Sequence, residues 1–222
     1  MIDHARTNAV TAPCRIGIVL FTNVEVLDFA GPFEVFSVAS RVALRDGDSA
    51  KAPFEVVTIA REQEVVARHG LRVVPDHTFE TCPPLDVILI PGGVVDAPLA
   101  DEETLRFLHE RTSGAKVVAS VCTGAFVLAR LGLLGDGPAT THWEDLRALR
   151  EAYPSIEVLD GPAFAWVRGK QRVVSSAGVA SGIAMSLALV ADLVGVDLAK
   201  RTARQIEFPF VDGVPNRAAL GG

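Results

Sequence analysis

The sequence predicts an α/β domain with an open, mostly parallel β-sheet between two layers of helices. Short runs of apolar and β-branched residues, typical of strands buried on both faces, alternate along the chain with helical segments. Hydrophobic residues make up 49% and charged residues 22% of the 222 residues, which is the composition of a globular protein. A chain of this length can bury one large core, so we expect a single domain.

The first quarter of the chain predicts two buried strands and one helix. Residues 1–14 have no apolar core and are expected to form a disordered leader. The run RIGIVLF at 15–21 predicts the first strand, and FEVVTIA at 54–60 predicts the second. Between them, FEVFSVASRVAL at 33–44 has helical periodicity, and Pro32 suits the first turn of that helix.

The middle of the chain predicts a hairpin, a third buried strand and a capped helix. Residues 64–79 contain two β-prone runs on either side of His69–Gly70, which indicates a hairpin. The run LDVILI at 85–90 predicts a strand and is followed by PGG. Asp101 is expected to cap the next helix, because its carboxylate can accept a hydrogen bond from a free first-turn N–H.

The second half begins with a fourth buried strand. The run KVVASV at 116–121 predicts this strand, and an apolar helix follows it. In THWE, Thr141 and Glu144 have the spacing of a capping box, so a helix is expected to begin at Thr141. Residues 156–176 are expected to form two or three short strands joined by glycine turns.

Two helices are expected to complete the domain, at about 178–194 and 197–208. The domain therefore spans 15–208, and residues 209–222 are expected to form a C-terminal tail.

Charge and hydropathy exclude several kinds of partner. Aspartate and glutamate outnumber lysine and arginine by 27 to 21, giving a net charge of −6. Binding of nucleic acid requires a basic surface, so we expect none. No apolar run approaches the ~20 residues that span a bilayer, and we expect a cytoplasmic protein without membrane association.

Cysteine and histidine spacing indicates no metal site. Cys14, Cys82 and Cys122 are odd in number and widely spaced, which fits neither a disulfide framework nor a zinc cage. The five histidines also lack the spacing of metal ligands.

Three segments that leave predicted strands carry the candidate site. In open parallel sheets, ligands bind outside the carboxyl ends of the strands. The segments are TNVEVLDFAGP at 22–32, PGG at 91–93 and CTGA at 122–125. If their strands are parallel, all three lie at one edge of the sheet.

Cys122 is the candidate nucleophile. SVCTG lies between a strand and a helix, the layout of a nucleophile elbow with serine in place of the first glycine. We expect the helix N-terminus behind Cys122 to favour the thiolate. The alternative is a small, buried, inert cysteine.

Asp28 is the candidate proton donor. It lies in an otherwise apolar segment, where burial of an unpaired carboxylate is costly. Partial desolvation raises the pKa of a carboxyl group, which can then donate a proton near pH 7. The alternative is a helix cap.

Four further residues complete the candidate site. Gly92 and Gly93 can direct backbone N–H groups at a reacting atom, or can simply form a tight turn. Thr123 places a hydroxyl beside the nucleophile, or caps the helix. His142 is either a general base or a surface residue.

These motifs, in this order, resemble the ThiJ/PfpI superfamily, which is related to the class I glutamine amidotransferases. The resemblance covers about 15–207 and is carried by LDFAGPFEVF, LDVILIPGG, VASVCTGAFVLARLGLL, ATTHWEDL and SSAGVASGIAMSLALV. It implies a flavodoxin-like three-layer sandwich and a homodimer. VCTGAF and ATTHW also resemble the sensor domains of AraC-type regulators.

The residues at the site distinguish the branches of this superfamily. Its intracellular proteases carry histidine after the cysteine, where this chain has Thr123, and its glyoxalases and deglycases carry glutamate in place of Asp28. Asp28, Cys122 and Thr123 resemble the set of the isocyanide hydratases. Relatives often have aspartate where this chain has Ala184.

The resemblance implies a cofactor-independent lyase with a small-molecule substrate. The Cys122 thiolate would attack an isocyanide carbon, Asp28 would transfer protons, and an N-substituted formamide would be released. Gly92, Gly93 and His142 would bind the substrate. The alternatives are a glutathione-independent glyoxalase or deglycase, and a ligand-sensing or redox-sensing module without catalysis.

Overall fold

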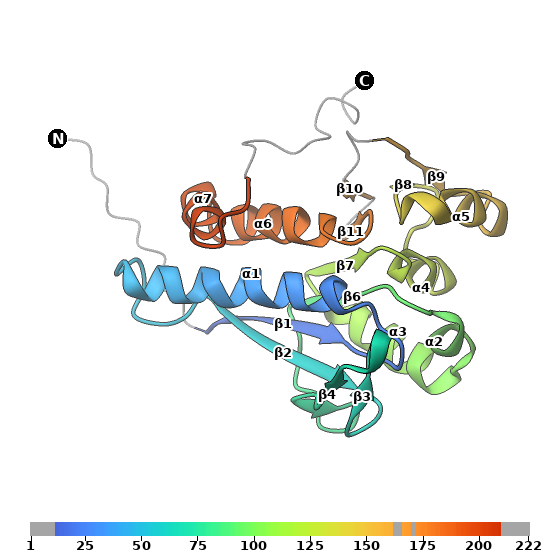
Figure 1. Cartoon of the computed structure of the whole chain (residues 1–222), viewed down its shortest axis with the longest axis horizontal. Helices are drawn as coiled ribbons and strands as arrows, with labels where there is room; N and C mark the ends of the chain where they lie inside the picture. Colours follow the sequence, from blue (N-terminus) through green and yellow to red (C-terminus); the bar gives the residue numbers. More distant parts are fainter. Residues whose placement is uncertain (1–11, 162–165, 170–171, 210–222) are drawn as a thin grey trace.

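The structure is a computed structural model that describes residues 12–161, 166–169 and 172–209 (Figure 1). Most of the predicted leader and nearly all of the predicted tail lie outside these residues. The predicted α/β fold is confirmed: a seven-stranded sheet lies between two layers of helices.

The central sheet is parallel except at one edge. Every neighbouring pair of strands is parallel apart from β10 and β11, which are antiparallel. In spatial order the strands are β10 (Trp166–Arg168), β11 (Val173–Ser176), β7 (Val117–Val121), β6 (Val87–Ile90), β1 (Cys14–Val19), β2 (Phe54–Ala60) and β5 (His77–Thr78). The four predicted buried strands are thus adjacent, and their carboxyl ends meet at one edge.

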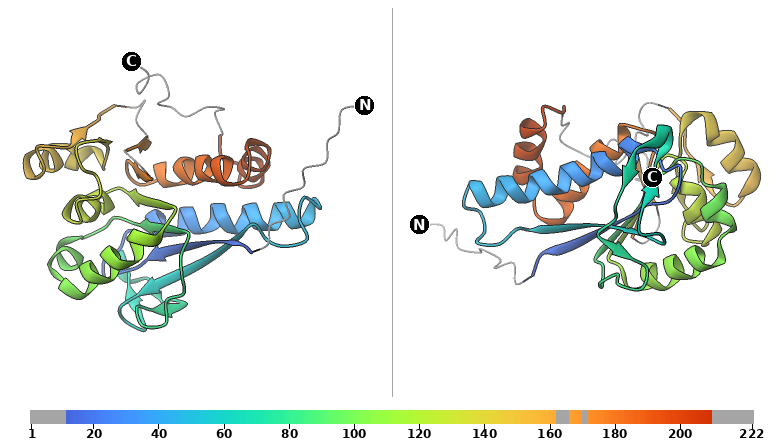
Figure 2. Two further views of the ribbon diagram at one scale, coloured as in Figure 1. Left: turned by 180° about the vertical axis from the view of Figure 1, so that it is seen from behind. Right: turned by 60° about the horizontal axis from the view of Figure 1, so that its bottom comes forward.

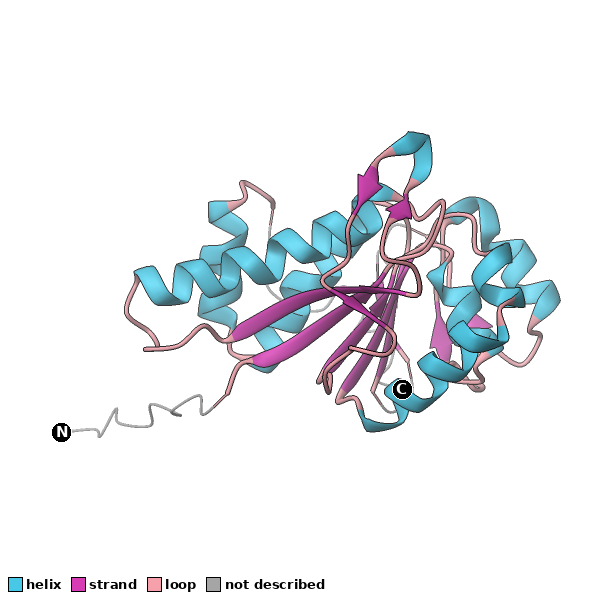
Figure 3. Ribbon diagram, turned by 90° about the horizontal axis from the view of Figure 1, so that it is seen from below, coloured by secondary structure: helices cyan, strands magenta, loops and turns pink. Residues whose placement is uncertain are grey.

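One hydrophobic core lies on each face of the sheet. Figures 1 and 2 show a layer of helices on each of these faces. The first layer consists of α1 (Val26–Arg45), α6 (Ser181–Leu193) and α7 (Val196–Gln205). The other layer consists of α2 (Asp96–Ala100), α3 (Glu102–Gly114), α4 (Gly124–Arg130) and α5 (Leu146–Ala152). Figure 3 shows the strands passing between these two groups of helices.

The helix predicted around Pro32 begins earlier than expected. α1 starts at Val26, so Pro32 lies inside the helix and Asp28 lies in its first turn, not in a loop. Pro32 has no N–H, so the helix lacks the bond to the Asp28 carbonyl. Phe29, Gly31 and Pro32 are buried, and this packing outweighs the unfavourable proline.

The predicted hairpin and helix cap are confirmed. β3 (Val65–Val66) pairs antiparallel with β4 (Arg72–Val73), and the 3₁₀ turn η1 (Arg68–Gly70) joins them. The Asp101 carboxylate accepts a hydrogen bond of 3.1 Å from the N–H of Thr104 and caps α3. A smaller parallel pair, β8 (Pro138–Ala139) and β9 (Glu157–Val158), lies outside the main sheet.

The predicted capping box is wrong. The 3₁₀ turn η2 (Trp143–Asp145) precedes α5, and no side chain caps either element. The Thr141 hydroxyl is buried and donates to the Cys122 carbonyl at 2.8 Å, so it is not available to a helix terminus.

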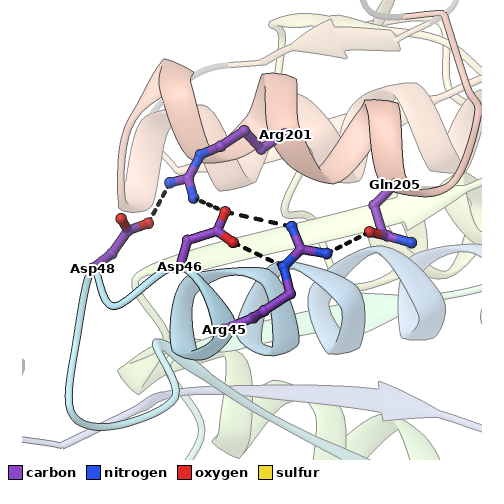
Figure 4. A network of polar contacts seen from close by, with 5 residues as sticks. All are labelled: Arg45, Asp46, Asp48, Arg201 and Gln205. Atoms are coloured by element: carbon purple, nitrogen blue, oxygen red, sulfur yellow. Dashed lines mark hydrogen bonds and ion pairs between the residues drawn. The ribbon is translucent and has the colours of Figure 1, made fainter.

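A network of charged side chains joins α7 to the segment after α1 (Figure 4). Arg201 pairs with Asp46 and Asp48, and Arg45 binds Asp46 and Gln205. Exposed ion pairs of this kind contribute only about 0–1 kcal/mol each to stability. The contact between α7 and this part of the chain is therefore stabilised by burial of the apolar helix faces. In the part of the chain that the structure describes, no helix has the length and apolar character needed to cross a membrane.

Candidate active site around Cys122

Cys122 lies at a strained turn between β7 and α4. Its φ is +56°, a left-handed conformation that costs a residue with a side chain about 1–2 kcal/mol. Its N–H donates to the Ser176 carbonyl of β11 at 3.1 Å. The Thr141 hydroxyl holds its carbonyl from the other side. The neighbouring segments therefore fix the backbone of this residue.

Gly124 allows the turn to pack against the end of β6. A Cβ at this position would lie 2.2 Å from the Ile90 carbonyl oxygen and 2.9 Å from that of Pro91. No other residue fits without moving backbone atoms, so the glycine of the SVCTG motif is required by close packing.

The Asp28 carboxyl is completely buried, with an exposed fraction of 0%. Its Oδ2 accepts a hydrogen bond of 3.0 Å from the Gly92 N–H, and its Oδ1 has no partner among the described residues. Burial raises the pKa of Asp28 to about 7, although the Gly92 N–H and the Cys122 thiol lower it. The carboxyl thus exchanges a proton in the neutral pH range.

Gly92 and Gly93 position the side chains of the site. The Gly93 N–H donates to the Thr123 hydroxyl at 2.9 Å, and that hydroxyl donates to the Gly93 carbonyl at 2.9 Å. The Gly92 N–H is used by Asp28. We expected these two N–H groups to face a reacting atom, but protein side chains occupy both. Their role here is to orient Asp28 and Thr123.

The Cys122 thiol is protonated in the free site. The residue is 7% exposed, and burial raises the pKa of the thiol to about 12, with the Asp28 and Asp145 charges acting in the same direction. Contacts with Thr123 lower this pKa only in part. The Thr123 N–H at the start of α4 favours the thiolate, as expected, but desolvation by burial has the larger effect and raises the pKa of the thiol. A base must remove the thiol proton.

His142 lies beside the nucleophile and is partly buried, with 20% of its side chain exposed. A Cβ on Gly178 would lie 2.3 Å from Cδ2 of His142 and 3.1 Å from Sγ of Cys122, so both side chains flank this glycine. The other side of the ring faces acids: Nδ1 of His142 is 3.6 Å from the carboxylates of Glu144 and Asp145.

The structure thus brings together all six candidate residues: Asp28, Gly92, Gly93, Cys122, Thr123 and His142. Sequence reasoning missed Gly178, for which the only signal was a glycine two residues after the predicted strands at 156–176. It also missed Thr141, because the capping-box spacing suggested another role. In the described ranges, no group of three His, Cys, Asp or Glu side chains could hold a metal ion.

Comparisons with known proteins identify the family of the chain. The DJ-1/PfpI family matches residues 14–192. The isonitrile hydratase of Pseudomonas putida is 37% identical over 213 residues, which cover 92% of this chain and 84% of that protein. The HTH-type transcriptional regulator GbdR of Pseudomonas aeruginosa is 29% identical over 145 residues, 65% of this chain but only 38% of the regulator.

A solved structure shows the same fold. The ThiJ/PfpI family protein from Pseudomonas syringae superposes with a TM-score of 0.75 at 27% identity, over 96% of this chain and 84% of that one. The family match covers most of the domain, including the elbow, the glycine turn and the first turn of α1. The chain therefore belongs to the DJ-1/PfpI family.

Proposed function

We propose that the protein is an isonitrile hydratase that converts R–N≡C to an N-substituted formamide at Cys122. One observation carries this proposal: the fully buried Asp28 carboxyl lies within hydrogen-bonding reach of the Cys122 thiol, which is held on a strained elbow. Isonitrile hydration by this route uses a sulfur nucleophile and a group that moves protons in both directions near neutral pH. Asp28, with its pKa raised to about 7, is suited to that role.

In the first step, Asp28 accepts the proton of the Cys122 thiol as the sulfur bonds to the terminal carbon of the isonitrile. Asp28 then donates this proton to the same carbon, which gives a thioimidate, R–N=CH–S, attached to Cys122. The raised pKa of the thiol makes this base necessary, because little thiolate exists before the substrate binds.

In the second step, ionised Asp28 removes a proton from water as the water oxygen bonds to the thioimidate carbon. Asp28 gives that proton to the nitrogen. The C–S bond then breaks, the hydroxyl proton returns to sulfur, and R–NH–CHO leaves. One water is consumed, and both side chains return to their starting states.

Exposed apolar side chains next to the site residues in sequence support an apolar R group. Leu27 and Val94 are exposed and adjoin Asp28 and Gly93 in sequence, and Trp143 adjoins His142 with 72% of its surface exposed. Large exposed apolar side chains close to a reactive group are typical of a ligand site. We propose a cyclic or aromatic isonitrile as substrate.

A second candidate function is ligand sensing without turnover, favoured by the similarity to GbdR. Redox sensing fits less well, because oxidation requires an accessible thiolate, and Cys122 is a buried thiol with a raised pKa. A glyoxalase is disfavoured by Asp28, because the glyoxalase branch carries glutamate there.

The test is incubation of the purified protein with cyclohexyl isonitrile and detection of N-cyclohexylformamide by NMR. We expect turnover in the wild type, a loss of at least about 10²-fold in Asp28→Asn, and complete loss in Cys122→Ala. Cys82→Ala is the matched control, since Cys82 is a buried cysteine outside the site, and it should keep full activity. Isonitrile binding without formamide would support the sensor instead.

A further inference from the structure

The β3–β4 hairpin is joined to the candidate site through the segment that precedes α1. The Asn23 N–H donates to the Val66 carbonyl at 2.8 Å, and the Arg68 N–H donates to the Val24 carbonyl at 3.0 Å. These bonds attach the hairpin to one side of the segment.

The other side of the same segment contacts the glycine turn. Val24 forms a β-bridge with Gly93, and the Glu25 N–H donates to the Gly92 carbonyl at 2.9 Å. Because the Gly92 N–H binds Asp28, an unbroken series of backbone contacts leads from the hairpin to the carboxyl group.

An ion pair crosses this junction. The Arg68 guanidinium from the hairpin lies 3.2 Å from the Glu25 carboxylate, which precedes Asp28 by three residues at the start of α1. Both charges act on Asp28: Glu25 raises its pKa and Arg68 lowers it. The two side chains are partly exposed, at 26% and 45%, so the pair is structurally replaceable.

The other elements around Asp28 carry different groups. The elbow contributes the Cys122 thiol and the Thr123 hydroxyl. His142, which precedes η2, and Asp145 of η2 lie on the side of Cys122, and α6 contributes the apolar Ile183 beside Gly31. The two charged side chains with the largest effect on the pKa of Asp28 are the anion Glu25, which precedes α1, and the cation Arg68 from the hairpin.

We propose that Glu25 and Arg68 are positioning residues that form a charge-setting pair for Asp28, with the docked hairpin supplying the cation. When the pair is intact, its two charges largely cancel at the carboxyl group. Loss of either partner exposes Asp28 to the uncompensated charge of the other. The effect of this pair on catalysis rests on the proposed function, but its effect on the pKa of Asp28 can be measured without substrate.

The experiment is a pH titration of the side-chain carbons in protein labelled with ¹³C-aspartate. The Asp28 signal is assigned by its absence in Asp28→Asn. We expect the titration midpoint to move to higher pH in Arg68→Gln and to lower pH in Glu25→Gln. In the double variant the midpoint should return close to the wild-type value. About 1 M salt should reduce both shifts, because the pair is partly exposed.

Arg72→Gln is the matched control. Arg72 pairs with Glu64 on the same hairpin, so this variant removes the same charge from the same element without touching Glu25. It should leave the Asp28 midpoint unchanged. Thermal unfolding of each variant shows whether the fold is kept. Single variants that move the midpoint in the same direction, or not at all, would overturn the proposal.

Turnover separates this inference from the proposed function. If isonitrile is hydrated, the pH–rate midpoints should shift in the same directions as the NMR midpoints. If the NMR midpoints shift in opposite directions but no formamide is formed, the proposed hydratase function is contradicted and the charge-setting pair is supported. If formamide is formed but the NMR midpoints do not move, the hydratase function is supported and the charge-setting pair is contradicted.

Discussion

At the scale of single residues, the properties of Asp28 and Cys122 depend on burial more than on any single contact. Asp28 accepts one backbone hydrogen bond, which favours its charged form, and desolvation still raises its pKa to about 7. Cys122 adjoins a helix N-terminus, and desolvation raises its pKa as well. At neutral pH the thiol therefore keeps its proton while part of Asp28 is ionised, and this ionised carboxylate is the form that can accept the thiol proton.

Asp28 should make folding stability fall as the pH rises. Its pKa is about 7 in the folded chain and 3.8 as the ordinary value, so the folded state binds the extra proton between these limits. The contribution of protonated Asp28 to the free energy of unfolding is fully present below pH 3.8 and is lost as the pH rises through 7. The difference between these two pKa values corresponds to a change of at most about 4 kcal/mol in the free energy of unfolding.

Asp28→Asn should remove this dependence, because the amide is neutral at every pH. We expect the variant to gain stability relative to the wild type between pH 5 and pH 8 in urea unfolding. Equal pH dependence in the two proteins would show that Asp28 is not desolvated.

Gly178 should be intolerant of any side chain. In Gly178→Ala the new Cβ would overlap His142 and press on Sγ of Cys122, because it would lie 2.3 Å from Cδ2 and 3.1 Å from Sγ. We expect isonitrile turnover to fall by about 10-fold to 100-fold, with a loss of stability of about 1–3 kcal/mol.

Gly114→Ala is the control for this change. Nothing lies within 4 Å of a Cβ built on Gly114, so the same methyl group should be neutral there. Full activity in Gly178→Ala would mean that the His142 ring moves freely and has no fixed place beside the thiol.

At the scale of elements, the local sequence was sufficient to predict a helix, turn or strand where the residues that determine it belong to that same element. The Asp101 cap, the hairpin around His69–Gly70 and the strand at 116–121 are found where the sequence predicts them. The α1 start and the role of Thr141 were not predictable in this way. Both depend on partners distant in sequence, such as the Cys122 carbonyl that accepts the Thr141 hydroxyl proton.

The Asp101 cap should contribute measurably to stability. Asp101→Ala removes the acceptor for the Thr104 N–H and should lower the free energy of unfolding by about 1 kcal/mol. Asp101→Asn keeps an acceptor and loses only the ion pair with Arg61, so its effect should be smaller. Equal losses in urea unfolding would assign the effect to the ion pair.

At the scale of the whole molecule, strand order creates the site. β1, β6, β7 and β11 are adjacent and parallel, so the segments that follow them converge at one edge of the sheet. The sequence could predict which segments meet, since buried strands identify a parallel sheet. It could not predict which N–H groups are already bonded, or how deeply Asp28 and Cys122 are buried, because these depend on side-chain packing.

The pH dependence of kcat/KM for cyclohexyl isonitrile is the most direct check that a buried acid activates a neutral thiol. We predict a rise with a midpoint near 7, the pKa of Asp28, and its loss in Asp28→Asn. A midpoint in the range of an ordinary free thiol, unchanged by that substitution, would contradict this account.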